Sequence, residues 1–164
     1  MTVQVLVLDR FGRYKDAREY RDFCICAWEG RGVEIRELLV QFYGGMWNRW
    51  DDSLVEAVLA EDFLFRGSLG VEVVGQQGWR AYRDAVRAGS SDFFNEIVAM
   101  VIEGDRAAVR LEYSGTHDGP LLDVPATGRR FRYSGAAFFV AGRGQLLNGW
   151  VLGDLRTLES QLRA

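Results

Sequence analysis

The spacing of apolar residues changes near residue 93, and this change restricts the fold more than any other feature of the chain. Before it, Ile35, Leu38, Leu39 and Phe42 recur at the three- and four-residue spacing of one helix face. After it, apolar and polar residues alternate over long runs, as in strands that bury one face. Helices followed by a series of long strands predict an α+β fold.

The turn and capping residues divide the chain further. A first helix is predicted from about residue 33 to residue 47, a second after the capping run Asp51–Ser53, and a third over 75–88. A short strand is predicted over 63–67. The remaining predicted elements are strands over 93–102, 106–117, 129–141 and 146–155, and a short helix over 157–162. The simplest arrangement is a curved antiparallel sheet wrapped round the first helix, with a pocket at the open end.

Composition excludes several classes of function. Lys plus Arg is 20 and Asp plus Glu is 23, so no basic field attracts nucleic acid. No stretch approaches the roughly 18 apolar residues of a membrane span. The 2 Cys and 1 His cannot supply the four ligands of a common zinc site, and we expect neither a metal nor a cofactor.

Residues 1–32 differ from the rest and are expected to form an N-terminal extension to a single domain over 33–164. The extension contains a strand-like start, a charge-dense stretch over 10–21 and the pair Cys24 and Cys26. The two Cys residues are expected to be reduced thiols of a cytoplasmic protein.

Two polar residues share a strand phase with apolar neighbours. His117 follows Val109, Leu111 and Tyr113 at even spacing, and Asp154 follows Trp150 and Leu152. We expect each apolar phase to line the concave side of the sheet, which would place both polar residues in the pocket. The alternatives are that Asp154 caps the terminal helix or pairs with Arg156, and that His117 is a hydrogen-bonded structural residue or a surface neighbour of Asp118.

Several motifs resemble the SnoaL-like polyketide cyclase (ester cyclase) family. They are Met46–Asp51, Asp62–Gly70, Gly115-Thr116-His117 with Gly119, Pro125–Arg130 and Trp150–Leu155. The resemblance implies the cone-shaped α+β barrel of the nuclear-transport-factor-two-like superfold, with one internal pocket and a homodimer formed through the outer sheet face. It also implies cofactor-free general acid/base catalysis by a carboxylate, a role that falls on Asp154, with His117 as its neighbour or the substrate orienter.

The function expected from this resemblance is aldol-type cyclisation of a polyketide-like or polycyclic carbonyl compound, as in antibiotic biosynthesis. Asp118 and Asp123 stand where the family often has a basic residue and a Gly, which argues against an anionic substrate. Flat apolar walls and hydrogen-bonding groups for a hydrophobic or polycyclic ligand are expected from Trp47, Asn48, Trp50, Tyr82, Tyr113, Tyr133, Phe139 and Trp150. Arg66 is expected at the site as the partner of an acidic residue, Asp62 or Asp154.

Two other functions remain open. An epoxide-opening hydrolase or isomerase on the same cone would need a carboxylate that holds a water, for which Asp62 with Arg66 is the visible candidate set. A non-catalytic ligand-binding protein would have a pocket lined by aromatic residues, with Asp154 bonded to backbone or exposed.

Overall fold

The computed structural model of the chain describes residues 6–8, 14–16 and 31–164, with side chains from residue 35 onward. The chain forms two compact units, Met1–Arg31 and Gly32–Ala164. In the first, β1 (Leu6–Leu8) pairs antiparallel with β2 (Tyr14–Asp16). The predicted thiols Cys24 and Cys26 lie outside the described residues.

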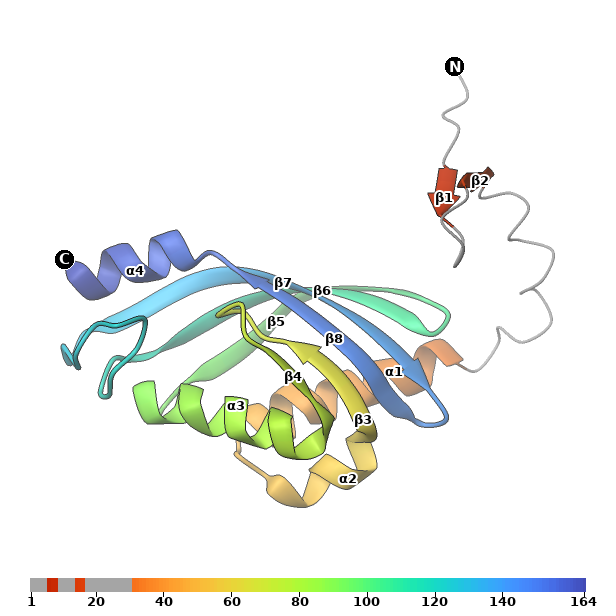
Figure 1. Ribbon diagram of the computed structural model, residues 1–164, viewed down its shortest axis with the longest axis horizontal. Helices are drawn as coiled ribbons and strands as arrows, with labels where there is room; N and C mark the ends of the chain where they lie inside the picture. The colour runs from red at the N-terminus through yellow and green to blue at the C-terminus, as the bar shows by residue number, and fades with distance from the viewer. Residues whose placement is uncertain (1–5, 9–13, 17–30) are drawn as a thin grey trace. The chain divides into compact units, whose positions relative to one another are not determined.

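The second unit is built on one curved six-stranded sheet, ordered β4-β3-β8-β7-β6-β5 (Figure 1). Its strands are β3 (Leu59–Arg66), β4 (Glu72–Val74), β5 (Phe94–Glu103), β6 (Arg106–Thr116), β7 (Arg130–Gly142) and β8 (Gln145–Gly153). All neighbours are antiparallel except β3 and β8, which run parallel. The α+β fold predicted from the change of period is confirmed.

Helices cover the concave side of this sheet (Figure 1). They are α1 (Arg31–Val40), a π-helix (η3, Gln41–Trp47), a 3-10 helix (η4, Asp52–Leu54), α2 (Val55–Val58) and α3 (Gly75–Gly89). The terminal α4 (Leu155–Arg163) instead lies along the end of β7 (Figure 1), where the Gln161 side chain hydrogen-bonds to the backbone of Arg132. Asp51 caps η4 as predicted, because its side chain accepts a hydrogen bond from the Ser53 backbone nitrogen. The single first helix of the prediction is in fact divided, since the backbone widens into a π-helix after Val40.

The core lies between the helices and the sheet and is rich in aromatic rings. Phe42 is fully buried at its centre. Its ring contacts those of Tyr43, Trp47, Phe63, Phe65, Trp79 and Phe139, at centroid distances from 5.0 to 6.5 Å. Rings at these separations pack favourably when tilted or edge-on, so this cluster holds the first helices against the sheet.

The prediction of which alternate residues face the core is correct for β6 and β7 and wrong for β8. Val109, Leu111 and Tyr113 are buried on β6, and Phe131, Tyr133, Ala137 and Phe139 are buried on β7. On β8, Val151 pairs with the inward-facing Ala137, while Trp150 pairs with the outward-facing Phe138. Both sets of alternate residues in β8 are largely apolar, so the sequence did not show which set faces the core. The register of β8 with β7 decides this.

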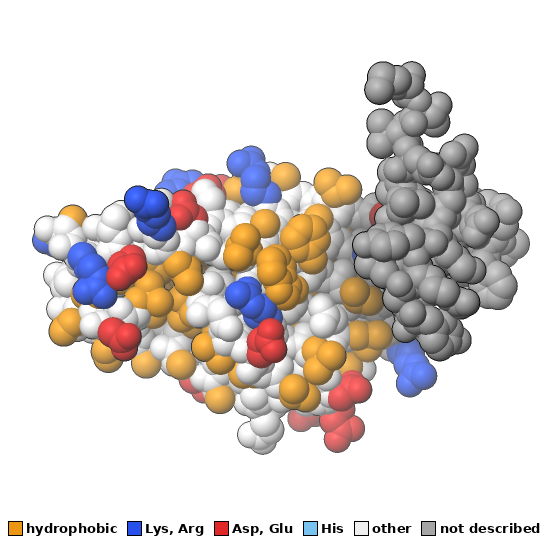
Figure 2. Space-filling view, turned by 45° about the horizontal axis from the view of Figure 1, so that its top comes forward, with side chains coloured by type: hydrophobic (Ala, Val, Ile, Leu, Met, Phe, Trp, Pro, Cys, Tyr) orange, Lys and Arg blue, Asp and Glu red, His pale blue; other side chains and the backbone are white. Residues whose placement is uncertain are grey.

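The convex face of the sheet therefore carries a band of apolar side chains, in which Trp150, Phe138, Ala108 and Val101 are successive cross-strand partners. Figure 2 shows hydrophobic side chains gathered over this face. Ile102 alternates with Val98, and this spacing predicts that both lie on the convex side. Ile102 is instead packed against the core, because a β-bulge after Ile97 shifts the phase of β5.

Two smaller differences concern the strands at the sheet's edge. β3 begins at Leu59 instead of the predicted residue 63, so Glu61 and Asp62 are exposed strand residues. The short strand β4 was not predicted. In the described part of the chain, no helix combines the length and apolar character needed to cross a membrane.

Candidate ligand-binding site

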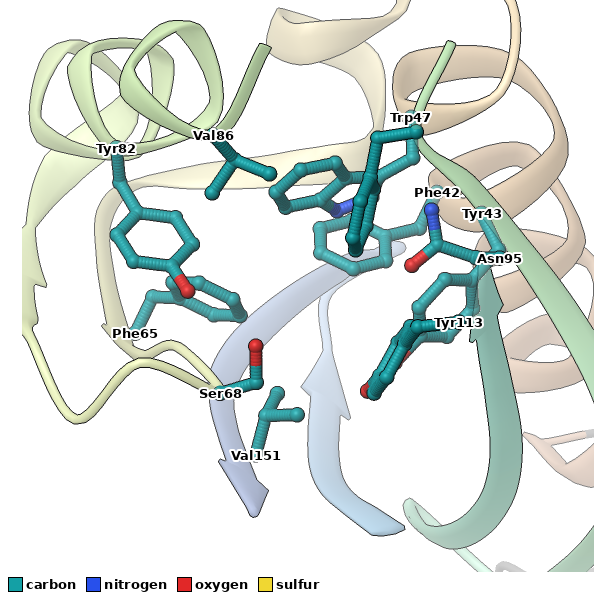
Figure 3. A pocket seen from close by; sticks show the side chains of 11 residues that line it. Phe42, Tyr43, Trp47, Phe65, Ser68, Tyr82, Val86, Asn95, Tyr113 and Val151 are labelled. Atoms are coloured by element: carbon teal, nitrogen blue, oxygen red, sulfur yellow. The ribbon is translucent and has the colours of Figure 1, made fainter. Parts of the chain in front are cut away.

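A pocket that is partly open to solvent lies between the helices and the concave side of the sheet (Figure 3). Eleven residues line it: Phe42, Tyr43, Trp47, Phe65, Ser68, Tyr82, Val86, Phe93, Asn95, Tyr113 and Val151. They come from η3, β3 and the turn after it, α3, β5 with the residue before it, β6 and β8. The site therefore forms only when segments far apart in the chain come together.

Aromatic rings supply most of the pocket wall. Trp47 contacts the rings of Tyr82 and Phe93 at 6.2 and 6.0 Å, and Phe93 stacks on Tyr113 at 5.8 Å. Figure 3 places Phe65 and Tyr82 on one side of the pocket and Tyr43, Tyr113 and Asn95 on the other. Faces of this kind favour a flat, apolar molecule.

Glycines allow two of these rings to lie against the backbone. A Cβ atom at Gly67 would overlap the ring of Tyr82, and one at Gly135 would overlap the ring of Tyr113. The positions of both tyrosines therefore depend on the absence of a side chain beneath them.

The polar atoms of the pocket are neutral hydroxyl and amide groups. The Tyr82 hydroxyl accepts a hydrogen bond from the Leu69 backbone nitrogen at 3.3 Å. Burial raises the pKa of Tyr82, and hydrogen bonding from the Ser68 side chain offsets this only in part. Burial likewise raises the pKa of Tyr43 and of Tyr113 well above the usual value. These phenols are therefore protonated hydrogen-bond donors throughout the physiological pH range.

Asn48 fixes the position of Asn95. The Asn48 Oδ1 atom accepts hydrogen bonds from the backbone nitrogen of Asn95 at 2.8 Å and from its Nδ2 atom at 3.1 Å. In return, Asn48 Nδ2 donates to the Asn95 carbonyl oxygen at 2.8 Å. This pairing joins the end of the π-helix to β5 and turns the Asn95 amide oxygen toward the pocket (Figure 3).

Of the predicted ligand-contacting residues, the structure brings Trp47, Tyr82 and Tyr113 together in the lining. Three others lie directly behind it. Asn48 holds Asn95, Tyr133 contacts the Tyr113 ring at 4.9 Å, and Phe139 belongs to the buried core.

The structure keeps the other three predicted contact residues away from the pocket. Trp150 is on the convex face, where the Arg66 guanidinium lies 5.1 Å from its ring centroid. Arg66 also donates to the Val151 carbonyl oxygen at 2.9 Å, and neither Asp62 nor Asp154 pairs with it. Trp50 packs against Trp47 and beneath Arg87. The expected ion pair of Arg66 was wrong because β3 turns this side chain outward.

The predicted pocket position of Asp154 is also wrong. Its side chain is exposed and accepts a hydrogen bond from the backbone nitrogen of Thr157, which makes it the N-cap of α4. Hydrogen bonds from the Thr157 side chain and backbone lower the pKa of Asp154. This carboxylate has the capping role that the sequence left as the alternative.

His117 is fully buried but does not line the pocket. Its Nδ1 atom lies 2.9 Å from the Thr127 hydroxyl, and its carbonyl oxygen accepts hydrogen bonds from the backbone nitrogens of Thr127 and Gly128. The residue thus holds the two ends of the 118–128 loop together, as its structural alternative predicted.

Ser68, which the sequence suggested as a hydrogen-bond donor to a carbonyl, also lines the pocket. Sequence reasoning missed the other seven lining residues: Phe42, Tyr43, Phe65, Val86, Phe93, Asn95 and Val151. Asn95 carried a signal, because it alternates with Phe93 and Ile97 as a polar residue on an apolar phase. Tyr43 carried only the helical spacing that it shares with Leu39, which predicts a buried face but not a place in the pocket. The pocket lining contains no Asp, Glu, His, Lys or Arg. Among the residues that the structure describes, no three His, Cys, Asp or Glu side chains are grouped so as to hold a metal ion.

Comparison with known proteins matches residues 37–162 to the family model of the SnoaL-like polyketide cyclases. A protein from Jannaschia sp. CCS1 that is named for these cyclases aligns with a TM-score of 0.76 at 19% identity, over 83% of this chain and 96% of its own. AclR from Streptomyces galilaeus, which is named for a hydroxylase, aligns with a TM-score of 0.69 at 23% identity. The alignment covers 80% of this chain and 82% of AclR. TsrD from Streptomyces laurentii aligns with a TM-score of 0.70 at 27% identity. The alignment covers 79% of this chain and 95% of TsrD. No curated protein sequence matches the chain.

Proposed function

Because the chain belongs to the SnoaL-like polyketide cyclase family and its pocket is walled by aromatic rings without a charged side chain, we propose that it binds a small, flat, neutral molecule that carries oxygen. The observation that carries this proposal is the composition of the lining. Stacking and burial favour an apolar ring system, while the Tyr and Ser hydroxyls and the Asn95 amide oxygen offer hydrogen bonds to polar substituents. A charged ligand would lose its hydration without gaining an ionic partner.

The first test is direct binding, measured by titration calorimetry with acetylnaphthalene as the probe. Val151→Phe, which places a ring in the pocket, is expected to weaken binding at least about tenfold. Val74→Phe adds the same group at an exposed position on β4 and is the matched control. If acetylnaphthalene does not bind to the native protein, or binds equally to both variants, the proposed function is wrong.

A second candidate is the aldol-type cyclisation that the family implies, and the tyrosine hydroxyls among the lining residues favour it. A protonated Tyr113 hydroxyl can donate to a substrate carbonyl oxygen and stabilise the enolate as the adjacent C–H bond breaks. Because the pocket lining supplies no carboxylate or imidazole, the proton would pass to water, which suits a substrate that is already acidic. The relatives named for a cyclase and for a hydroxylase share the fold, so the fold alone does not select the reaction.

The exchange of α-protons of beta-tetralone for deuterium, followed by nuclear magnetic resonance, separates the two candidates. If the protein catalyses enolisation, the α-protons should exchange faster in its presence than in buffer alone. This acceleration should be lost in Tyr113→Phe. An exchange rate equal to that in buffer, together with measurable binding, would leave ligand binding as the function.

We also propose that the convex face pairs with a second copy of the chain. Phe138, Leu152, Trp150 and Val101 are large apolar side chains exposed on this face, and exposed patches of this kind commonly mark interaction surfaces. Sedimentation at micromolar concentration should give a dimer, and Phe138→Glu should give a monomer. A monomeric native protein would contradict the pairing without affecting the binding proposal.

A further inference from the structure

The hydroxyl group of Tyr43 is buried and has no hydrogen-bond partner among the residues that the structure describes. Buried hydroxyls are nearly always bonded, because desolvation without a partner costs free energy. The neighbouring phenols differ in this respect. The Tyr82 hydroxyl accepts from the Leu69 nitrogen, and that of Tyr133 is hydrogen-bonded to the Ser68 side chain. Among the tyrosines that line the pocket, Tyr43 is thus the one whose hydroxyl is buried without any hydrogen-bond partner in the described part of the chain.

Tyr43 lines the pocket from a segment with an unusual backbone. It lies in the π-helix, and its carbonyl oxygen accepts from the backbone nitrogen of Asn48, five residues on, at 2.9 Å. Single π-helical turns within helices are frequent at functional sites. In Figure 3, Tyr43 stands beside Tyr113 and Asn95, across the pocket from Phe65 and Tyr82.

The surroundings of Tyr43 set what it can bind. Burial keeps the phenol protonated, so it presents an O–H group that needs an acceptor. A ketone oxygen supplies that acceptor and remains neutral. A carboxylate supplies it as well, but the pocket lining contains no Lys, Arg or His to balance the charge.

We propose, resting on the binding function above, that Tyr43 is a specificity-determining residue that donates a hydrogen bond to the carbonyl oxygen of a neutral aryl ketone. Tyr113 lies next to it and offers a second donor to the same oxygen. The pocket then selects among flat apolar molecules by requiring a carbonyl group at the Tyr43 side and by rejecting an anionic group there.

The test compares three probes of similar shape by titration calorimetry: acetylnaphthalene, ethylnaphthalene and naphthoate. The native protein is expected to bind acetylnaphthalene about tenfold more tightly than ethylnaphthalene and to bind naphthoate more weakly still. In Tyr43→Phe, the preference for acetylnaphthalene over ethylnaphthalene should disappear. The melting temperature of this variant should hold or rise, because the unbonded hydroxyl is removed.

Tyr133→Phe is the matched control, because it removes a hydroxyl that is already bonded and lies behind the lining. It should melt at a lower temperature and keep the preference for acetylnaphthalene. If the native protein binds acetylnaphthalene and ethylnaphthalene equally, or if Tyr43→Phe keeps the preference, the role of Tyr43 is wrong while the binding function stands. Failure of all three probes to bind would instead overturn the proposed function.

Discussion

The carboxylate of Asp154 accepts a hydrogen bond of 3.1 Å from the backbone nitrogen of Thr157, and this contact begins helix α4. The same helix buries Leu158 and Leu162 against the sheet. An acidic residue that ends the last strand therefore anchors the C-terminal helix rather than acting in the pocket.

Asp154→Ala is expected to lower the melting temperature without changing the affinity for acetylnaphthalene. Asp154→Asn should lower the melting temperature much less, because Asn also caps helices well. The pKa of Asp154 is lowered in the folded state, so its stabilisation is present above the ordinary Asp pKa of about 3.9 and is lost as the pH falls through the lowered value. The difference in melting temperature between the native protein and Asp154→Ala should therefore shrink in acid. Loss of binding with an unchanged melting temperature would place Asp154 at the site after all.

Asn48→Ala is expected to destabilise the protein by about 2–4 kcal/mol, because it removes three hydrogen bonds to Asn95 and leaves part-buried groups unbonded. Affinity for acetylnaphthalene should fall as well, since Asn95 is released from its place in the pocket wall. Chemical denaturation and calorimetry measure the two effects. Gln77→Ala, at an exposed position on α3, is the control. Equal stability of the two variants would contradict the role assigned to Asn48.

Gly135→Ala is expected to lower the free energy of unfolding by about 1–3 kcal/mol and to weaken ligand binding, because the added methyl group displaces the Tyr113 ring. Gly44→Ala serves as the comparison, since a Cβ atom at Gly44 meets nothing within 4 Å. That second variant should be neutral or more stable by up to about 1 kcal/mol, as expected for Ala in a helix. A stable Gly135→Ala protein with native affinity would show that the ring can move freely.

Alkaline unfolding should coincide with the ionisation of the buried tyrosines. Burial raises the pKa of Tyr43, Tyr82, Tyr113 and Tyr133 in the folded state. Their contribution to stability is therefore complete below the unfolded-state pKa of about 10 and is lost as the pH rises above it. Phenolate absorbance from these residues should appear together with the loss of circular dichroism. Ionisation of all 6 tyrosines before any loss of structure would contradict their burial.

Much of the fold could be predicted from the local pattern. The change from helical to alternating spacing located β5, β6, β7 and β8 to within one or two residues at most ends, and α3 almost in full. Hydrophobic periodicity carries this information because a helix or strand with one buried face needs apolar residues at its own repeat. The same pattern placed Trp47, Tyr82 and Tyr113 toward a common pocket.

The assignment of faces could not be predicted wherever both phases of a strand are apolar. Trp150 and Val151 are equally compatible with burial, and the pairing of β8 with β7 puts Val151 inside and Trp150 outside. In β5, a bulge after Ile97 reverses the phase of every later residue, including Ile102. Such shifts depend on contacts with the neighbouring strand and leave no local signal.

The sequence by itself thus determined most of the helices and strands, their order and the family to which the chain belongs, because these depend on periodicity and motif. Only the tertiary structure decided that Asp154 caps a helix, that His117 holds a loop together and that Tyr43 lines the pocket with a buried, unbonded hydroxyl. The physical reason is that the role of a polar side chain depends on which groups surround it. Those groups come from segments far apart in the chain, so that Asn95 is held by Asn48, 47 residues earlier.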